Sequence, residues 1–294
     1  MNSDFKKPKK SNIVLNFEVK DKAPKKDKQL QRTVDWKMQR LGRWTGSQLK
    51  NLMTCSAAGG KLSWNDIDKV FLLGTGALKY IYENSMERKT GRYIETGDGT
   101  KQMRYGTKVE PLIAKATKAE LKKMGVKGKM KDVGFKVFPT IENAGVSSDA
   151  ILIDKETKET TASVEMKACC SWSSHYDRTF DFMDEKGIDF WQTQGQMIAW
   201  GVDITYYVVA QPPSDISKYL YYEGDIMDLY SDFIEECPIS IEVIKASKTH
   251  QNAMLKRIII AEKTVNDFLK DGKSLKASLY KNIDYYKSNQ DLLK

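Results

Sequence analysis

The chain has 294 residues, of which 40% are hydrophobic and 30% charged, and its formal net charge is +9. No apolar run approaches the roughly 20 residues of a membrane-spanning helix, and two histidines argue against a histidine-built zinc site, so we expect neither membrane association nor zinc chemistry. The N-terminus lacks the apolar core of a secretory signal and the four cysteines form no C-x-x-C pair, so we expect a cytoplasmic protein with reduced thiols.

The positive charge is unevenly distributed along the chain. Residues 1–28 contain nine lysines and four acidic residues, so a net charge of +5 belongs to this segment. Its Lys and Pro content and its few apolar residues predict a flexible basic tail. A solubilising terminus and an arm that contacts phosphates both fit this composition. Residues 29–294 are expected to form a single domain.

Predicted helices dominate the first part of this domain, and no internal repeat is present. Apolar residues at helical spacing predict helices at Thr33–Arg40, from Thr45 or Ser47 onward, at Ser63–Arg88 and at Met103–Gly125. The glycine-punctuated segment Thr96–Lys101 is expected to be a loop before the last of these helices.

Short β-rich segments follow, and then helices and strands alternate. Strands are predicted at Phe135–Ile141, Val146–Ile153, Ala162–Ala168, Ile204–Pro213 and Ile239–Ala246. A charged linker precedes a predicted helix at Ile188–Gly201, and a long helix is expected around Asn252–Lys270. Helices, then a mixed sheet, then helices predict an α/β (α+β) fold with a central mixed β-sheet flanked by helices, including C-terminal helices.

Charged residues interrupt two of the predicted strands. Asp154–Glu159 is polar and is expected to connect Val146–Ile153 and Thr161–Ala168 into a β-hairpin. Because side chains alternate along a strand, Glu165 and Lys167 are predicted to point to the same face, with Asp149 alongside.

Such a cluster needs a physical reason. Two carboxylates that are buried close together repel each other, and burying them without partners is costly. A divalent cation removes both objections, because Mg²⁺ prefers oxygen ligands and takes one or two carboxylates plus water and a substrate phosphate. A nearby lysine could orient or deprotonate an attacking water. The alternative is a solvent-facing hairpin with a Lys–Glu pair, and this pattern alone leaves the two open.

Four sequence segments are each weak indicators of a protein family, but their occurrence in a fixed order is a much more specific one. They are an Arg-Leu-Gly and small-residue turn in Asp35–Thr54, a Gly-to-Glu helix in Tyr105–Thr117, the hairpin described above, and a Q-x-Q helix in Trp191–Trp200. In this order they resemble the phage λ-exonuclease and YqaJ-type recombination nucleases of the PD-(D/E)xK superfamily, over roughly residues 35–211. Ser148 departs from the pattern, since the superfamily usually has proline there.

The resemblance implies a metal site. It makes Asp149, Glu165 and the backbone carbonyl of Met166 metal ligands, and it places Glu110 near the same metal from its helix. Lys167 would position or activate the nucleophilic water. Without the resemblance, Glu110 would be interpreted as an exposed helical carboxylate.

The resemblance also implies roles outside the hairpin. Gln194 would contact the metal-site water or Lys167, and Gln196, one helical step away, would contact the DNA substrate. Arg40 and Ser47 would bind a terminal phosphate of DNA, which suits a forked arginine donor and a serine near a helix N-terminus. A helix cap and a surface arginine are the alternatives that the residues themselves favour.

The function implied is a Mg²⁺-dependent deoxyribonuclease, with Mn²⁺ as a substitute, that acts as a processive 5′→3′ exonuclease on double-stranded DNA ends. A homotrimeric ring, a single-strand annealing partner and a phage or prophage origin are implied with it. Two alternatives stay open: a structure- or sequence-specific endonuclease of the same fold, and a DNA-binding protein with a decayed site. The intact Asp149, Glu165 and Lys167 argue against the last.

Overall fold

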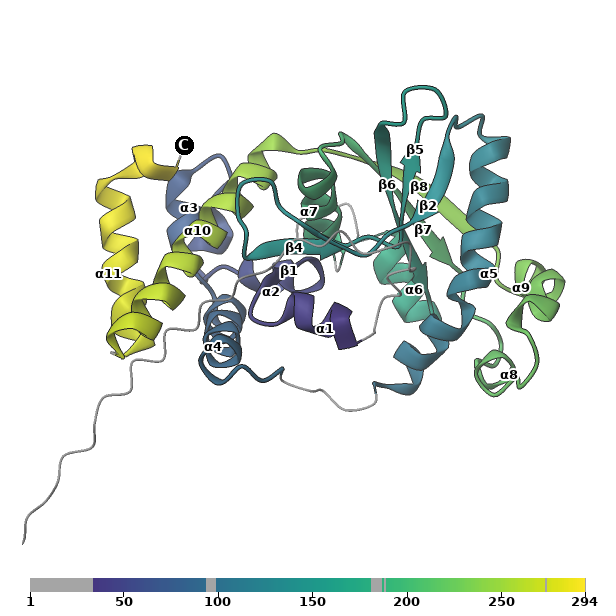
Figure 1. Ribbon diagram of the computed structural model, residues 1–294, viewed down its shortest axis with the longest axis horizontal. Coiled ribbons are helices and arrows are strands. Elements are labelled where there is room, and N and C mark those ends of the chain that lie inside the picture. The colour runs from purple at the N-terminus through teal and green to yellow at the C-terminus, as the bar shows by residue number, and fades with distance from the viewer. Residues whose placement is uncertain (1–33, 94–98, 181–186, 188, 273, 294) are drawn as a thin grey trace, which may run out of the picture.

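The computed structural model describes residues 34–93, 99–180, 187, 189–272 and 274–293 (Figure 1). The basic tail that the sequence predicts, residues 1–28, lies outside the described residues, as do residues 96–98 of the predicted loop Thr96–Lys101. Within the described part of the chain, no helix is long and apolar enough to cross a membrane.

A five-stranded mixed sheet organises one half of the molecule. Its strands, in spatial order, are β2 (Lys129–Asp132), β5 (Ala150–Ile153), β6 (Thr160–Ala168), β7 (Ile204–Ala210) and β8 (Ile239–Lys245). The pair β6–β7 is parallel and the other pairs are antiparallel. The prediction of a central mixed sheet is therefore confirmed.

Helices cover both faces of this sheet, and the alternation along β7 shows why. Tyr206 and Val208 belong to one apolar core, which they share with helix α5 (Lys101–Lys123). Tyr207 points to the opposite face, where it shares a core with Met197 of helix α7 (Phe190–Trp200). Figure 1 shows α5 and α7 on either side of the strands. A strand that is buried on both faces reads as the continuous apolar run seen in the sequence.

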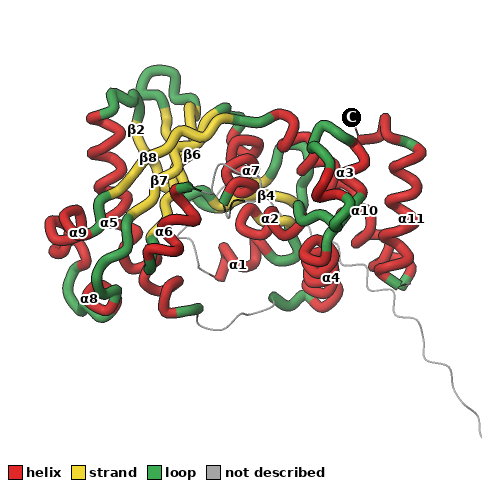
Figure 2. The backbone as a smooth tube through the Cα atoms, turned by 180° about the vertical axis from the view of Figure 1, so that it is seen from behind, coloured by secondary structure: helices red, strands yellow, loops and turns green. Residues whose placement is uncertain are grey.

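A smaller sheet links this layer to the helical half of the molecule. It contains β1 (Trp44–Thr45), β4 (Ala144–Ser147) and β3 (Phe135–Val137), with β4 in the middle. The remaining α-helices are α1 (Val34–Arg40), α2 (Leu49–Leu52), α3 (Ile67–Phe71), α4 (Thr75–Thr90), α6 (Trp172–Thr179), α8 (Ser217–Leu220), α9 (Tyr230–Glu236), α10 (Lys248–Asp271) and α11 (Leu275–Ser288). In Figure 2, seen from behind, α3, α4, α10 and α11 gather at the end remote from the large sheet.

Two predicted elements are divided in the structure. The helix predicted at Ser63–Arg88 is two helices, α3 and α4, because the chain between them pairs with Cys55 through an isolated bridge at Leu73. Gly74 permits this close approach, since a Cβ there would lie 2.6 Å from the Cys55 carbonyl oxygen. Asp66 caps α3 by accepting a hydrogen bond from the Asp68 amide.

The strand predicted at Val146–Ile153 is also divided, and that prediction was wrong in one respect. Its first part is β4 in the small sheet and its second part is β5 in the large sheet, so the chain changes sheets at Ser148–Asp149. The hairpin itself is confirmed, because β5 pairs antiparallel with β6 across the turn at residues 154–159. Asp149 therefore lies at the junction of two sheets, where the ladder is broken and a side chain can turn inward.

Candidate active site

The carboxylates of the hairpin meet at the sheet junction. Oδ2 of Asp149 accepts a hydrogen bond of 2.7 Å from the backbone amide of Met166 on β6. The neighbouring Glu165 is buried, with 2% of its surface exposed, and its Oε1 lies 2.6 Å from Nζ of Lys167. The structure thus brings Asp149, Glu165 and Lys167 together and places Glu165 and Lys167 on one face of the strand, as the alternation along β6 predicts.

Helix α7 supplies two amides to the same carboxylate. Gln192 donates from Nε2 to Glu165 Oε1 at 2.7 Å, and Gln196 donates from Nε2 to Glu165 Oε2. Lys167 in turn donates to Oε1 of Gln192 at 3.2 Å. Residues four apart lie on one side of a helix, so α7 presents both amides to Glu165 and fixes its orientation.

The position predicted for Gln194 is corrected by the structure. Its Nε2 donates to the carbonyl oxygen of Lys245 at 3.1 Å, and its Oε1 accepts from the amide of Ser247 at 2.9 Å. These contacts tie α7 to the end of β8, away from Lys167. The reason is helical geometry, because a residue two positions from Gln192 and Gln196 points to the other side of α7. Gln192, which sequence reasoning missed, takes the contact with Lys167.

Asp189 is a second residue that sequence reasoning missed. It directly precedes α7 and is buried, with 5% of its surface exposed. Oδ1 lies 3.2 Å from Nζ of Lys167, while Oδ2 accepts a 2.6 Å hydrogen bond from the Tyr207 hydroxyl and lies 3.3 Å from Nε of Arg178 on α6. Lys167 therefore sits between two buried carboxylates, Glu165 and Asp189.

The electrostatics of the cluster follow from burial and crowding. Burial, followed by the charge of Glu165, raises the pKa of Asp149 well above its usual range. Burial also raises the pKa of Glu165, although Lys167 opposes the shift. For Lys167, burial alone would lower the pKa, but the carboxylates of Asp189 and Glu165 outweigh it and the pKa is raised. The folded protein thus favours the charged form of Lys167 and disfavours the charged forms of Asp149 and Glu165, and a further cation beside these carboxylates would relieve their crowding.

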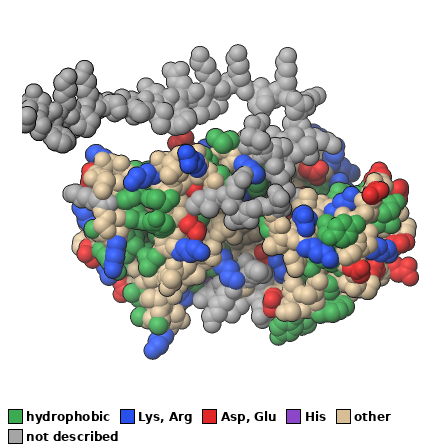
Figure 3. Space-filling view, turned by 90° about the horizontal axis from the view of Figure 1, so that it is seen from below, with side chains coloured by type: hydrophobic (Ala, Val, Ile, Leu, Met, Phe, Trp, Pro, Cys, Tyr) green, Lys and Arg blue, Asp and Glu red, His purple; other side chains and the backbone are tan. Residues whose placement is uncertain are grey.

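A large cleft joins this cluster to other predicted site residues. Its volume is about 1010 Å³, and Asp149, Glu165 and Lys167 line it together with Glu110 of α5. The charge of Glu110 contributes to the raised pKa of Asp149, which places the two carboxylates in one electrostatic environment. Figure 3 shows this hollow between the two halves of the molecule, with Lys and Arg side chains near its edges.

The predicted phosphate residues, Arg40 and Ser47, line the same cleft. Arg40, the last residue of α1, donates to Ser47 Oγ at 3.1 Å and to Ser147 Oγ at 3.3 Å. Its guanidinium lies 4.2 Å from the ring centroid of Trp36, whose Nε1 also donates to Ser147 Oγ at 2.9 Å. Ser47 is exposed in a short 3₁₀ turn, Gly46–Gln48, directly before α2. The Arg40 guanidinium and the Ser47 hydroxyl therefore lie next to each other on the wall of the cleft.

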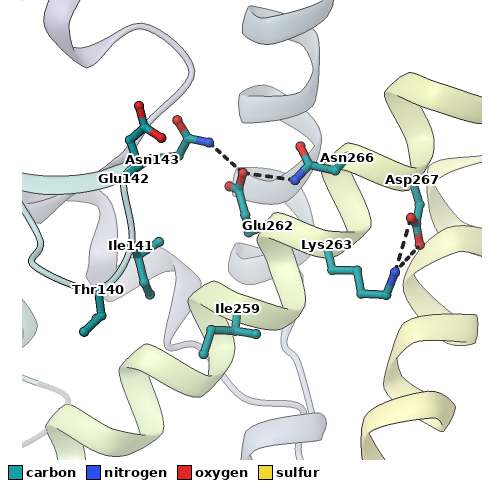
Figure 4. Close-up of a pocket in the computed structure, with 9 residues that line it drawn as sticks. All are labelled: Thr140, Ile141, Glu142, Asn143, Ile259, Glu262, Lys263, Asn266 and Asp267. Atoms are coloured by element: carbon teal, nitrogen blue, oxygen red, sulfur yellow. Dashed lines mark hydrogen bonds and ion pairs between the residues drawn. The ribbon is translucent and has the colours of Figure 1, made fainter. Parts of the chain in front are cut away.

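A half-buried ion pair between Arg88 and Glu262 anchors the turn that follows Arg40. Arg88 of α4 donates from Nε to the Gly42 carbonyl oxygen at 2.6 Å, and its terminal nitrogens contact both oxygens of Glu262 at 2.8 and 2.6 Å. Glu262 also accepts from the indole of Trp44 at 2.9 Å and from Asn143 at 2.7 Å, as Figure 4 shows for Asn143. Helix α10 thus holds the Arg40 turn in place through α4.

The donor set can be compared with what a metal ion requires. Among the described residues, no three Asp, Glu, His or Cys side chains converge as a ready-made metal cluster. Asp149, Glu165 and the carbonyl of Met166 instead offer two carboxylates and a main-chain oxygen. That set fits Mg²⁺, which completes its coordination with water and substrate oxygens, and it does not fit zinc, which prefers nitrogen and sulfur ligands.

Two solved structures that are similar to this chain in fold are described as exonucleases. The structure described as LHK-Exo in complex with dAMP, an alkaline exonuclease from Laribacter hongkongensis, matches with a TM-score of 0.50 and 22% identity, over 89% of this chain and 100% of that one. A phage-related exonuclease from Haemophilus somnus 129PT matches with a TM-score of 0.53 and 18% identity, over 79% of this chain and 96% of that one. No protein-family model and no curated protein matches the sequence. The chain therefore has the mixed α/β fold of phage-related alkaline exonucleases.

Proposed function

We propose that this protein is a Mg²⁺-dependent deoxyribonuclease that degrades double-stranded DNA from its ends, processively and in the 5′→3′ direction. One observation carries the proposal: a single cleft is lined both by the acidic cluster of Asp149 and Glu165 and by the phosphate-binding pair of Arg40 and Ser47. A nuclease that acts at ends needs both a cleavage centre and a group that recognises the end. The fold shared with phage-related exonucleases supports the same proposal.

The acidic cluster is the proposed cleavage centre. Asp149, Glu165 and the carbonyl of Met166 would hold Mg²⁺, with Glu110 facing it from α5, and Mn²⁺ would substitute. When bound, the metal activates a water and stabilises the charge on the phosphate oxygens. Lys167 is held in the protonated form by its carboxylate neighbours, so it orients the water and stabilises the phosphate as a cation.

The amides of α7 prepare Glu165 for this task. Because Gln192 and Gln196 donate to different oxygens of Glu165, the carboxylate cannot rotate freely. A ligand that is already oriented loses less conformational entropy when it binds a metal. In this arrangement Gln196 acts on the carboxylate of Glu165, whereas the sequence pattern assigned it to DNA.

In this proposal Arg40 and Ser47 select the DNA end. The Arg40 guanidinium lines the cleft, where Trp36, Ser147 and Ser47 hold it in place, and an arginine carries several N–H donors that can bind a phosphate. A terminal 5′ phosphate is a dianion, and a charge-assisted contact with Arg40 and Ser47 would be stronger than the contact with an internal phosphate. This preference would set both the starting point and the direction of degradation.

The test uses linear duplex DNA labelled at either the 5′ or the 3′ end, with and without Mg²⁺. Release of 5′-terminal mononucleotides that depends on Mg²⁺ and is absent in EDTA is expected. Cleavage of covalently closed circular DNA would favour the endonuclease alternative, and DNA binding without any cleavage in Mg²⁺ or Mn²⁺ would favour the decayed-site alternative. A ring-like homotrimer and an annealing partner belong to the same proposal, and sedimentation of the purified protein tests the first of these.

A further inference from the structure

Lys167 has more partners than a water-orienting lysine needs. Its three N–H donors contact Glu165 Oε1 at 2.6 Å, Asp189 Oδ1 at 3.2 Å and Gln192 Oε1 at 3.2 Å. The ammonium is thus saturated inside the protein. The strongest of these contacts is with Glu165, whose oxygens are also the proposed metal ligands.

These two roles of Glu165 conflict. Lys167 occupies Glu165 Oε1 and Gln196 occupies Oε2, so a metal ion at Glu165 would share the carboxylate with the ammonium, and two cations on one carboxylate repel each other. Binding of a metal at Glu165 therefore requires Lys167 to move from Oε1. The move is costly unless a second carboxylate takes over the charge, because an ammonium that is left unpaired in a buried site is strongly destabilised.

Asp189 is built to be that second carboxylate. The Tyr207 hydroxyl and the Arg178 guanidinium hold its Oδ2, which leaves Oδ1 directed at Lys167. It lies at the start of the same helix that carries Gln192, so the anchor and the amide that contact Lys167 belong to one rigid element. The pKa of Asp189 is lowered because the charges of Lys167 and Arg178 outweigh the effect of burial, so the carboxylate stays charged.

We propose that Asp189 is a positioning residue that takes Lys167 from Glu165 when a divalent cation binds. The inference rests on the proposed metal site and adds to it a defined partner for the displaced lysine. Asp189 contacts neither metal nor DNA and acts only through Lys167. Without it, Lys167 remains on Glu165 and competes with the metal.

The experiment measures Mn²⁺ binding to the DNA-free protein by electron paramagnetic resonance, so it needs no catalysis. Four proteins are compared: wild type, Asp189→Asn, Lys167→Met and the double variant. Asp189→Asn is expected to weaken Mn²⁺ binding roughly tenfold, the factor that corresponds to about 1.4 kcal/mol. In the Lys167→Met background the same substitution is expected to change Mn²⁺ binding less than twofold, because no lysine remains to compete.

The double variant separates this inference from a plain charge effect. If Asp189 merely added negative charge near the metal, Asp189→Asn would weaken Mn²⁺ binding equally in both backgrounds, and the inference would be wrong. An unchanged affinity in Asp189→Asn would overturn it as well. If the wild-type protein bound no Mn²⁺, the proposed metal site itself would fail and the inference with it.

Two further variants control for structural damage. Tyr207→Phe removes the hydroxyl that holds Asp189 Oδ2 and is expected to weaken Mn²⁺ binding in the same direction but less, about two- to threefold. Ser163→Ala breaks the buried 2.6 Å hydrogen bond to Thr205, between the same two strands but away from Lys167. It should leave Mn²⁺ binding unchanged, and a loss there would show that any disturbance of β6 and β7 produces the effect and would overturn the inference.

Discussion

Arg88 and Gly42 are joined by a 2.6 Å hydrogen bond from the guanidinium Nε to the carbonyl oxygen, although they are 46 residues apart in the chain. Gly42 has a φ of +65°, and a Cβ at this position would lie 2.5 Å from Cγ of Arg88. Because the Arg88 head group is fixed by Glu262, the side chain has little freedom to move away. The turn after Arg40 therefore requires glycine for two independent reasons, conformation and space.

Gly42→Ala is expected to lower the free energy of unfolding by about 2–3 kcal/mol, of which the left-handed conformation accounts for about 1–2. Gly91→Ala is the matched control, since Gly91 has a φ of +64° and open space around its Cβ position. It should cost only the conformational part. Thermal and urea unfolding measure both variants, and equal losses would show that the contact with Arg88 is unimportant.

Arg40→Ala is expected to slow degradation of 5′-phosphorylated ends by one to two orders of magnitude. The lost charge-assisted contact is about 1.5–3 kcal/mol, at roughly tenfold per 1.4 kcal/mol. Ends that carry a 5′ hydroxyl should be degraded at similar rates by both proteins, and Mg²⁺ dependence should be unaltered. Lys276→Ala, an exposed cation on α11, serves as the control. A wild-type protein that ignored the state of the 5′ end would contradict the phosphate pocket.

Asp149→Asn is expected to abolish cleavage while making the metal-free protein more stable. The pKa of Asp149 is raised in the folded state, so between the unfolded and folded pKa values the folded protein binds more protons than the unfolded one. Stability then falls as pH rises through this window, and the penalty is complete above the folded pKa. Removing the charge should stabilise the protein at pH 8 in EDTA by on the order of 1 kcal/mol.

The same substitution should also change the effect of Mg²⁺ on the melting temperature. Mg²⁺ should raise the melting temperature of the wild-type protein, because it binds the folded state alone, and it should have little effect on Asp149→Asn. Melting curves in EDTA and in Mg²⁺, at pH 5 and pH 8, provide the measurement. If Asp149→Asn were less stable than wild type in EDTA at pH 8, the cost of burying the Asp149 carboxylate would be fully offset by its contacts in the metal-free protein.

Gln192→Ala and Gln194→Ala are expected to have different effects. Gln192 contacts Glu165 and Lys167, so its loss should lower the rate of cleavage about tenfold with a small effect on stability. Gln194 holds the backbone at Lys245 and Ser247, so its loss should cost about 1–3 kcal/mol of stability and leave the cleavage rate of the folded protein near wild type. The reverse result would restore the role that the sequence pattern gave to Gln194.

Deletion of residues 1–28 is expected to leave metal-dependent cleavage in place. It should weaken DNA association mainly at low salt, because a segment with a net charge of +5 makes screened contacts with phosphates. Binding measured at several salt concentrations gives the slope of affinity against salt, which should be shallower after deletion. A truncated protein that failed to fold would show instead that this segment is structural.

The hairpin was predictable because its signal is local. Alternation along β6 places Glu165 beside Lys167 whatever else the chain does. The change of sheets at Asp149 was not predictable, because it depends on the pairing of β4 with β1, which is remote in sequence. Strand β2 was missed because three of its four residues are charged, as an edge strand allows.

The sequence indicated only some of the residues that α7 contributes to the candidate site. The Q-x-Q pattern directed attention to Gln194 and Gln196, whereas positions 189, 192 and 196 follow the helical period and face one side. Applying that period would have pointed to Gln192 and Asp189. Their partners, however, come from β6, β7 and α6, and no spacing in the sequence reveals those contacts.

Side chains of three consecutive residues at the junction between the two sheets accept hydrogen bonds from other parts of the fold. Ser147 accepts hydrogen bonds from Trp36 and Arg40, Ser148 accepts one from Trp200, and Asp149 accepts one from Met166. Arg40, the residue proposed to bind a DNA end, is therefore hydrogen-bonded to a residue that lies two positions before Asp149, a proposed metal ligand. In a nuclease of the proposed kind, this short stretch of backbone would keep the distance between the bound DNA end and the cleavage site constant.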